Sequence, residues 1–552
     1  MNSKQKKYLK ENVRLKDLDF LARETGIEES EIKNYFKKVW RKEKYEKYFH
    51  KKKGETNYKT TYVSIFLAIV ALAVYINSLG NGFVSDDLPA IVNNVKIGEF
   101  SNIFFQPWSF IRPLFYWIIF HITGSNPWLF RLLNIALHLG SVLILYLLVK
   151  KIATARTALI TALLFAVHPI LTESITWISG GPYAQYSFFV ILALWYYTET
   201  KFKRSVFSYL LAAMTAPLAV VFPLMLGLYE LTFGNLKANW KRLVPYFVIS
   251  GLWTLFLSGM LGYRVNTLKN DFYQDTGKFN PLIQIPLAIT EYLRLIFWPS
   301  DLTLYHSELV ISPMGYGVRL LVMGGLLALL VYGFKRQKLV FFGLSFFIIS
   351  LLVTLTPLKI SSVVAERYVY LGSLGVILVI ALLINKLIEK SRYMGWTVLI
   401  ILTCLLSVRT IIRNADWRSE DSLWLASAKT SPSSENNHNN LGDYYSRQGD
   451  YHKAVKEFSK AIELKPNYAD AFHNRANAYL QLKNFTSAEA DYLSAIRFNP
   501  RLWQSDQNLA GLYYQQGKIA KAIEYLQKAL ELVPDNQVLQ ENLRQLKLIP
   551  QN

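Results

Sequence analysis

Two adjacent carboxylates, Asp86 and Asp87, follow directly on an apolar run from Thr61 to Leu79 that is long enough to enter a membrane. An acid pair at the point where a chain leaves a bilayer can act as a general base, hold a cation or stay solvated. The rest of the chain favours a base, with Asp86 as the first candidate and Asp87 as its orienting partner. A divalent cation shared by both carboxylates stays open as an alternative.

Further polar residues lie where apolar segments end, and an ionisable group at membrane depth needs a partner or a purpose. Arginine binds phosphate through two parallel hydrogen bonds, so arginines beside the acid pair are candidates for contact with a phosphate group. Arg367, expected at the outer mouth of a later helix, is the first choice, and Arg112, expected in the same outer loop as Asp86 and Asp87, is the second. The candidate substrate-binding residues are Arg112, His168, Glu173, Glu366, Arg367 and Tyr368.

Each of these residues also has a structural interpretation. A hydrogen bond between His168 and Glu173 would explain both residues, and an ion pair or an interfacial position would explain either arginine. Glu291 and Arg294 are three residues apart and predict an internal ion pair. The chain contains no nucleotide-phosphate loop or metal-ligand cluster motif, and the single Cys404 excludes an intrachain disulfide.

The composition predicts a chain that is part membrane protein and part soluble protein. Of its 552 residues 52% are hydrophobic and 14% aromatic, yet both ends are strongly charged. The formal net charge is +22, but many basic residues flank apolar runs, where they set orientation in a bilayer. We therefore expect a lipid bilayer and no nucleic acid as partner. About sixty polar residues precede the first apolar run, as in a retained anchor.

Apolar stretches predict about eleven crossings, with the amino end cytoplasmic and the carboxyl end outside. Two short crossings are expected between the basic clusters 201–204 and 237–242, where Pro217 and Pro223 would let the chain fold as a short hairpin. The stretch 282–298 is taken as partly inserted. The loops at Asp86, at His168, from Tyr263 to Pro313 and from Pro357 to Arg367 then share the outer face. The other expected stretches are Tyr62–Leu79, Trp128–Val149, Ala158–Val167, Gln185–Tyr197, Leu243–Gly262, Val318–Phe334, Leu339–Leu355, Tyr368–Leu387 and Trp396–Ile412.

A repeat of thirty-four residues fills the carboxyl-terminal part. Small residues at helix contacts, aromatic residues between them and prolines after each second helix resemble three tetratricopeptide repeats, with Gln537 to Leu548 as a closing helix. The repeated positions are Gly442, Ala476 and Ala510; Tyr445, Tyr479 and Tyr513; Ala454, Ala488 and Ala522; Ala461, Ala495 and Ala529; and Pro466, Pro500 and Pro534.

The fold class expected is therefore all-α, in four parts. Residues 1–59 form a basic cytoplasmic segment that resembles a helix-turn-helix, with two short helices that break at Thr25-Gly26. Residues 60–413 form the membrane domain, 414–434 a linker and 435–552 the repeats.

Short motifs occur along the chain in an order that is typical of one protein family. The chain from about Tyr62 onward resembles bacterial relatives of the transmembrane and tetratricopeptide-repeat-containing O-mannosyltransferases, which have the C-type glycosyltransferase fold. The motifs are Asp86-Asp87, Arg112-Pro113-Leu114, Asn134, His138, His168-Pro169-Ile170, Glu173, Trp177-Ile178-Ser179-Gly180, Trp298-Pro299-Ser300-Asp301-Leu302, Ala365-Glu366-Arg367-Tyr368 and Trp417.

The resemblance implies transfer of a sugar, with mannose favoured, from a polyprenyl-phosphate donor to an acceptor outside the cytoplasm, with inversion at the sugar. It places the chain in the inner membrane of a bacterium and maps the acceptor-side carboxylate to Asp86 or Asp87. The sequence departs from the family pattern at Gly181 and at Ala216-Pro217, where relatives often carry basic residues.

Two other classes of function stay open. The repeats would also suit a non-enzymatic membrane scaffold for protein complexes, because such arrays commonly bind proteins. A lipid flippase or transporter would need a polar pathway at the midplane and repeated halves, and the sequence shows neither.

Overall fold

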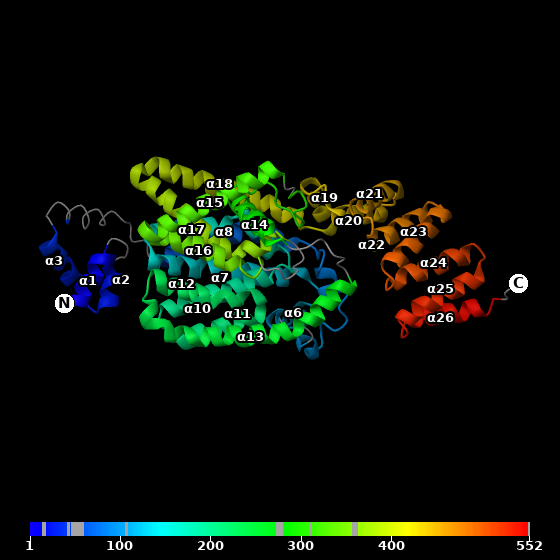
Figure 1. The fold of residues 1–552 in the computed structure, drawn as a ribbon, viewed down its shortest axis with the longest axis horizontal. Coiled ribbons are helices and arrows are strands. Elements are labelled where there is room, and N and C mark those ends of the chain that lie inside the picture. The colour runs from blue at the N-terminus through cyan, green and yellow to red at the C-terminus, as the bar shows by residue number, and fades with distance from the viewer. Residues whose placement is uncertain are drawn as a thin grey trace. The chain divides into compact units, whose positions relative to one another are not determined.

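A computed structural model describes residues 1–13, 18–40, 45, 60–104, 109–271, 280–309, 312–355 and 363–549, and within these ranges it contains helices and no strand (Figure 1). Its contacts divide the chain into two units. The first comprises 1–264, 277–302 and 311–419, and the second comprises 265–276, 303–310 and 420–552. The all-α prediction is confirmed.

Three helices, α1 (Ser3–Asn12), α2 (Leu18–Thr25) and α3 (Glu29–Val39), form the amino-terminal segment. Leu9, Leu21 and Phe36 are among the residues of their common core. The break at Thr25-Gly26 is confirmed, since Gly26 has a φ of +65° that favours glycine. The sequence predicted two helices and missed α1. The basic cluster Lys51–Lys53 lies outside the described residues.

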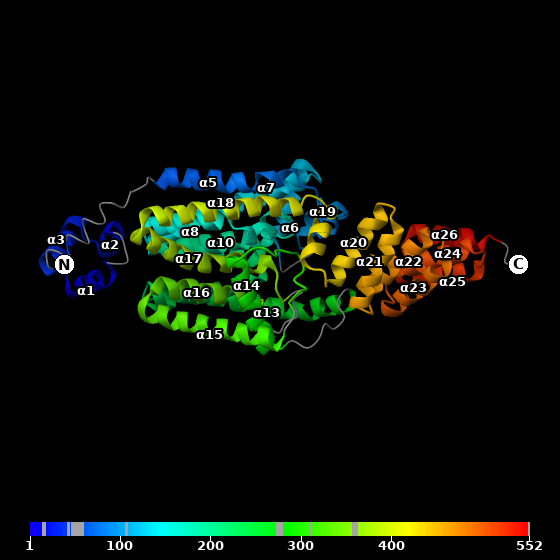
Figure 2. The same cartoon turned by 90° about the horizontal axis from the view of Figure 1, so that it is seen from above.

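The membrane domain is built from long apolar helices. In Figure 2, α8, α17 and α18 run side by side, and α8 also contacts α5 and α7. α8 is buried along almost its whole length and forms the centre. The helices are α5 (Thr60–Tyr75), α6 (Ile111–Thr123), α7 (Pro127–Ile152), α8 (Ala155–Val167), α9 (Thr172–Thr176), α10 (Pro182–Thr198), α11 (Phe202–Thr215), α12 (Phe222–Thr232), α13 (Leu236–Asp271), α14 (Pro281–Phe297), α15 (Pro313–Arg336), α16 (Lys338–Leu351), α17 (Tyr370–Lys390) and α18 (Arg392–Asp416).

Short helical turns join several of these helices: η2 (Ile76–Gly80), η3 (Leu88–Val92), η4 (Phe100–Phe104), η5 (Pro169–Leu171), η6 (Pro217–Val221) and η7 (Glu366–Val369). The expected break at Pro217 is present, because α11 ends at Thr215 and η6 and α12 follow. Two expectations for loops were wrong. Arg112 lies in the first turn of α6, and α13 continues past Tyr263 to Asp271.

Six helices of the described chain are long and apolar enough to cross a membrane, and a seventh span results if α8 and the segment Pro169–Thr176, bent by 54°, count together. The six ranges are Thr60–Gly80, Pro127–Ile152, Leu236–Gly259, Pro313–Arg336, Glu366–Lys390 and Arg392–Asp416. Pro217–Thr232 and Lys338–Leu351 are shorter apolar helices. The count of about eleven crossings and the side of each loop stay predictions.

The second unit contains α19 to α26 in antiparallel pairs. α19 occupies most of the range expected as a linker and packs on α20. α26 is the expected closing helix and packs on α25. The elements are α19 (Glu420–Thr430), α20 (Glu435–Arg447), α21 (Tyr451–Leu464), α22 (Ala469–Gln481), α23 (Phe485–Phe498), α24 (Trp503–Gln515), α25 (Ile519–Leu532) and α26 (Gln537–Lys547).

Helices α16 and α17 approach each other most closely at Gly343 and Gly375. A Cβ on either glycine would collide with the backbone carbonyl oxygen of the other. Small residues allow such close contact between helices in a membrane. The backbones are therefore held at a separation that no larger residue permits.

We expect Gly375→Ala to lower the melting temperature of the detergent-solubilised protein, because the added methyl overpacks this contact at a cost of about 1–3 kcal/mol. Gly325→Ala is the matched control, since nothing lies within 4 Å of a Cβ at that position in α15. Helix propensity alone would make both changes neutral or stabilising. Thermal unfolding measured by size-exclusion chromatography distinguishes the two variants, and equal melting temperatures would contradict the contact.

Candidate functional site

The acid pair lies in a loop that follows η2, and the two carboxylates have opposite environments. Asp86 is exposed, whereas Asp87 is fully buried. Ser85 has a φ of +54°, in the left-handed region that a residue with a Cβ rarely adopts. Such backbone strain persists only where the surroundings enforce it. The loop is therefore held in a conformation that presents one acid to solvent and turns the other inward.

Asp87 binds backbone N–H groups with both carboxylate oxygens. Its Oδ1 accepts from Ser179 N at 2.8 Å and its Oδ2 accepts from Val84 N at 3.2 Å. Burial raises the pKa of Asp87 to about 6, and these hydrogen bonds and the charge of Arg131 oppose the rise. The inward acid thus closes the loop on itself and attaches it to the segment after α9.

Arg131, which the sequence analysis did not single out, fastens the start of the same loop. It is fully buried in α7, where its guanidinium donates to the carbonyl oxygens of Asn81 and Gly82 and its Nε donates to Thr176 O at 2.9 Å. A charged residue near the end of an apolar helix was the available signal. One side chain therefore joins the acidic loop to the end of α9.

The carboxyl end of α18 supports the loop from another side. Asn81 Nδ2 donates to Asn414 O at 2.9 Å, and Gly82 N donates to Arg418 O at 2.8 Å. Asn414 also accepts from Thr176 Oγ1 at 2.8 Å. Residues more than 300 positions apart in the sequence thus meet at the base of the loop.

The stretch Trp177-Ile178-Ser179 links the loop to both candidate arginines. Trp177 Nε1 donates to Val84 O at 3.3 Å, and Arg367 lies over the Trp177 ring at 5.7 Å. On the other side, Tyr116 Oη donates to Ile178 O at 3.2 Å, and Arg112 lies over the Tyr116 ring at 5.3 Å. The resemblance motifs around Asp86, Arg112, Trp177 and Arg367 therefore form one connected site.

The two arginines differ in their charge balance. Arg367 forms an ion pair with the buried Glu173, whose other oxygen accepts from Arg367 N at 2.8 Å. The guanidinium also faces the rings of Tyr183 and Tyr368. Arg112 has no carboxylate within ion-pair distance among the described residues and is partly exposed. Among the described residues, therefore, none balances the charge of Arg112, whereas Glu173 neutralises that of Arg367.

The remaining candidates are buried. His168 uses both ring nitrogens, because Nε2 bonds Ile296 O at 2.9 Å and Nδ1 accepts from Ile170 N at 3.3 Å; the alternative hydrogen bond to Glu173 was wrong. Tyr368 is 2% exposed and packs beside Arg367. Glu366 is fully buried and forms an ion pair with Arg413 at 3.3 Å. Of the six substrate-binding candidates, Arg112 and Arg367 are partly exposed, and the side chain of Arg367 is 12% exposed.

The predicted Glu291–Arg294 ion pair is confirmed at 2.7 Å, and Arg294 also pairs with Asp301 at 2.8 Å. The departure at Gly181 has a packing reason. A Cβ there would collide with the side-chain amide of Asn134, which accepts a hydrogen bond from Gln185 at 3.1 Å. A basic side chain at this position would require Asn134 to move.

The two carboxylates lie in different environments, which does not favour a cation shared between them. Backbone N–H groups occupy both oxygens of Asp87, and Asp86 points to solvent. Within the part of the chain that the structure describes, no group of three His, Cys, Asp or Glu residues could hold a metal ion. The geometry leaves Asp86 as an unshared carboxylate.

Comparisons with known proteins first define the class. Residues 442–483 match the TPR repeat family, and residues 469–502 and 507–536 match the tetratricopeptide repeat family. The NMR structure of the first TPR domain of human RPAP3 is 26% identical over 21% of this chain and 92% of that chain, with a TM-score of 0.21. Together with the apolar helices, the matches to the two repeat families define an all-α membrane protein with a tetratricopeptide array.

Curated relatives then show which proteins the whole chain resembles. Protein O-mannosyl-transferase TMTC3 of Mus musculus is 26% identical over 82% of this chain and 56% of its own length. Protein O-mannosyl-transferase F38B6.6 of Caenorhabditis elegans is 24% identical over 73% of this chain and 63% of its own length. Protein O-mannosyl-transferase TMTC1 of Homo sapiens is 26% identical over 74% of this chain and 56% of its own length. The chain is a homologue of the TMTC protein O-mannosyl-transferases and spans a little over half the length of these relatives.

We expect Arg131→Met to release the acidic loop while the helices stay folded. Loss of charged hydrogen bonds to Asn81 and Gly82 should speed hydrogen–deuterium exchange of residues 81–87 roughly tenfold or more. Lys150→Met, a change of the same kind in the same helix, is the control and should leave that exchange unchanged. Unchanged exchange in Arg131→Met would show that other contacts hold the loop.

The buried Asp87 predicts a pH dependence of stability. Its pKa is raised from 3.8 to about 6, so the folded state binds this proton more tightly than the unfolded state. The resulting stabilisation is complete below pH 3.8 and is lost as the pH rises through about 6, a change of up to about 3 kcal/mol.

The side chain of Asp87→Asn does not titrate in this range. The melting temperature of this variant minus that of the parent should therefore rise as the pH increases from 4 to 6.5. Thermal unfolding followed by tryptophan fluorescence measures the difference, with the exposed Asp86→Asn as control. Parallel pH curves for the parent and Asp87→Asn would rule out the shift.

Proposed function

We propose that the chain is a membrane glycosyltransferase that moves a sugar, with mannose as first candidate, from a polyprenyl-phosphate donor to a Ser or Thr hydroxyl of a protein outside the cytoplasm. The observation that carries this proposal is the exposed Asp86, held on a fixed loop that is connected to Arg112 and Arg367. The printed names of the relatives, protein O-mannosyl-transferases, supply the sugar and the acceptor class.

Asp86 acts as the general base. Its carboxylate takes the proton of the acceptor hydroxyl while that oxygen attacks the anomeric carbon of the sugar. The bond between the anomeric carbon and the phosphate oxygen breaks, and the electron pair leaves with the polyprenyl phosphate. A single displacement of this kind inverts the configuration at the sugar. Asp87 positions Asp86 through the loop and takes no proton from the substrate.

An arginine stabilises the charge that builds on the departing phosphate, an effect that reaches a few kcal/mol in closed sites. The sequence favoured Arg367 for this role. The charge balance favours Arg112, because Glu173 already neutralises Arg367. Arg367 then shapes the site through the rings of Trp177, Tyr183 and Tyr368.

An apolar groove supports a lipid-linked donor. It has a volume of about 1000 Å³ and lies between α12, α13 and α16, where aliphatic and aromatic side chains such as Leu228, Trp240 and Phe247 line it. A long isoprenoid chain can pack along such a groove through van der Waals contacts, without a charged contact. A soluble nucleotide donor has no long apolar chain that could occupy this groove.

The proposed orientation keeps the basic amino-terminal helices in the cytoplasm and the repeats outside, where they recruit the acceptor protein. The excess of Lys and Arg before the first apolar helix supports this side. In a bacterium, the corresponding membrane is the inner membrane.

We expect Asp86→Asn to lower sugar transfer about 100-fold or more, because a positioned base contributes on that scale. The assay uses membranes that contain the expressed chain, radiolabelled polyprenyl-phosphate mannose and a Ser/Thr-rich peptide. Glu99→Gln, another exposed acid in the same loop region, is the control and should keep full transfer. Because Asp86 is exposed, the variant should also fold normally.

Full transfer by Asp86→Asn at normal expression would refute the assignment of the base. Absence of transfer by the parent with each polyprenyl-phosphate hexose tested would favour the non-enzymatic scaffold instead.

A further inference from the structure

One end of the membrane domain gathers basic side chains that the proposed transfer reaction does not use. At this end α10 is followed by α11, and α12 is followed by α13 (Figure 1). The two turns are in contact, because Arg242 of α13 lies over the Phe202 ring of α11 at 5.2 Å. Two chain segments that are about forty residues apart therefore form one surface.

The start of α5 lies at the same end. Lys151 of α7 pairs at 2.6 Å with Glu199, which lies in the turn between α10 and α11. The neighbouring Lys150 donates to Thr60 Oγ1, at the start of α5, at 3.0 Å. The acidic loop follows the other end of this helix and η2, so the basic end and the candidate site are separated by the length of α5. In the proposed orientation, the basic end faces the cytoplasm.

Exposed basic residues are frequent at this end, and acids are rare. Residues 195–246 contain two acids, Glu199 and Glu230. Glu199 pairs with Lys151, and its other oxygen lies 4.0 Å from Lys201. The exposed basic residues of the same range are Lys201, Lys203, Arg204, Lys237, Lys241 and Arg242. Apart from the contact of Lys201, none of them forms an ion pair with a residue that the structure describes.

Glu230 does not neutralise these residues, because its carboxylate is used inside the fold. It is 3% exposed and accepts hydrogen bonds from Tyr197 Oη at 2.7 Å, Asn235 N at 3.0 Å and Asn239 Nδ2 at 2.9 Å. These bonds attach the turn between α12 and α13 to α10. The acid thus fixes the backbone beside the basic residues of α13, while its own charge stays buried.

Two helices begin at this end, which adds to the positive charge. The amino end of a helix carries a partial positive charge that favours acids and disfavours cations. Neither α11 nor α13 has an acid in its first turn, and both have a lysine there, Lys203 and Lys237. Like charges therefore meet without a counter-charge from the described chain. An anion bound from outside would relieve this repulsion.

Three of the basic side chains are held on aromatic rings. The pairs are Lys201 over Trp195 at 5.7 Å, Arg204 over Tyr196 at 5.9 Å and Arg242 over Phe202 at 5.2 Å. A cation that lies on a ring face keeps N–H groups at its edge for another ligand. All three rings are partly exposed, and rings of this kind are typical of the level of the lipid headgroups.

An apolar surface continues from the basic residues along α11. Lys203, Phe207 and Leu210 are spaced by four and three residues, so they share one face of the helix. Phe207 is 62% exposed and Leu210 is 38% exposed. A ligand at the basic end thus meets apolar side chains in the direction of the bilayer core.

We propose that this end of the membrane domain binds an anionic phospholipid. Its headgroup phosphate lies within the cluster Lys201, Arg204 and Arg242, and one acyl chain packs along Phe207 and Leu210. A guanidinium binds phosphate through parallel hydrogen bonds, and a headgroup with net negative charge supplies the missing counter-charge. A zwitterionic headgroup carries its own cation and supplies none. The site is independent of the transfer reaction.

The test measures lipid retention by the full-length chain in detergent with native mass spectrometry. Phosphatidylglycerol and phosphatidylcholine with identical acyl chains are added in equal amounts. We expect adducts of phosphatidylglycerol to exceed those of phosphatidylcholine roughly fivefold or more, because several basic residues act on one anionic headgroup.

The double variant Arg204→Gln with Arg242→Gln should lose most of this preference, with roughly fivefold fewer phosphatidylglycerol adducts than the parent. Lys386→Gln with Lys390→Gln is the matched control. It removes the same charge from two exposed lysines near the end of α17 and should retain the lipid as the parent does. Melting curves in phosphatidylcholine verify that both variants stay folded.

Unchanged retention by the folded double variant would overturn the proposal, and so would an equal loss in the control, which would show an effect of net charge alone. Two soluble competitors distinguish other anions. Glycerol 1-phosphate that displaces the lipid at equal concentration would assign the cluster to free phosphate esters. A polyglutamate peptide that does so would assign it to acidic proteins. Either result would refute a lipid site.

Discussion

The structure of the candidate site depends on one buried guanidinium. Arg131 of α7 donates to carbonyl oxygens of Asn81, Gly82 and Thr176, so a single side chain joins the acidic loop to the end of α9. A buried charge without hydrogen bonds and buried carbonyls without donors are both costly. Each group here satisfies the other, and the loop cannot leave without exposing both. The position of Asp86 is thus set from within a membrane helix.

Around this anchor, the membrane domain balances most of its buried charge in pairs. Glu173 forms an ion pair with Arg367, and Glu366 forms one with Arg413. These pairs stabilise the Trp177-Ile178-Ser179 stretch and the start of α17. Asp86 and Asp87 are stabilised differently from these ion pairs. Asp87 is solvated by backbone N–H groups, and Asp86 by water. Asp86 therefore stays accessible while the hydrogen bonds of Asp87 hold the backbone beside it in place.

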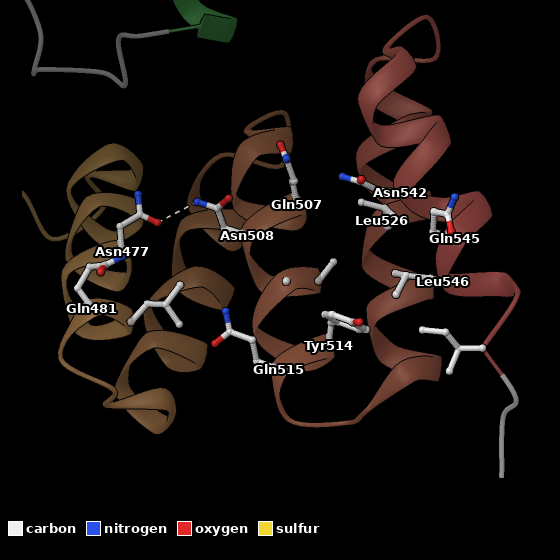
Figure 3. A pocket seen from close by; sticks show the side chains of 14 residues that line it. Asn477, Gln481, Gln507, Asn508, Tyr514, Gln515, Leu526, Asn542, Gln545 and Leu546 are labelled. Carbon is white, nitrogen blue, oxygen red and sulfur yellow. Dashed lines mark hydrogen bonds between the residues drawn. The ribbon is translucent and has the colours of Figure 1, made fainter.

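Small residues allow close contact between helices in both units of the chain. In the membrane domain, Gly343 and Gly375 allow the close approach of α16 and α17. In the repeats, alanines at thirty-four-residue spacing do the same for paired helices, and the face they leave open carries carboxamides such as Asn477 and Asn508 (Figure 3).

The sequence by itself determined the helices and their repeat, because these depend on local properties: the length of apolar runs, the spacing of small residues and the prolines after each repeat. Boundaries such as Pro127–Ile152 and Gln537–Lys547 lie within a few residues of those predicted. It failed at α6, where Arg112 and Pro113 read as a loop although proline is well tolerated in the first turn of a helix.

The tertiary structure decided which of the two acids is exposed and which partner each charged residue has. The ion pair of Glu173 with Arg367 spans 194 positions, and Arg131 meets Gly82 across 49. No local pattern encodes such contacts, because they arise from the packing of helices that are distant in the chain. The sequence therefore predicted most residues of the candidate site. Only the fold showed that Asp86 and Arg112 are exposed at least in part, whereas other residues of the site are buried and hold the loop in place.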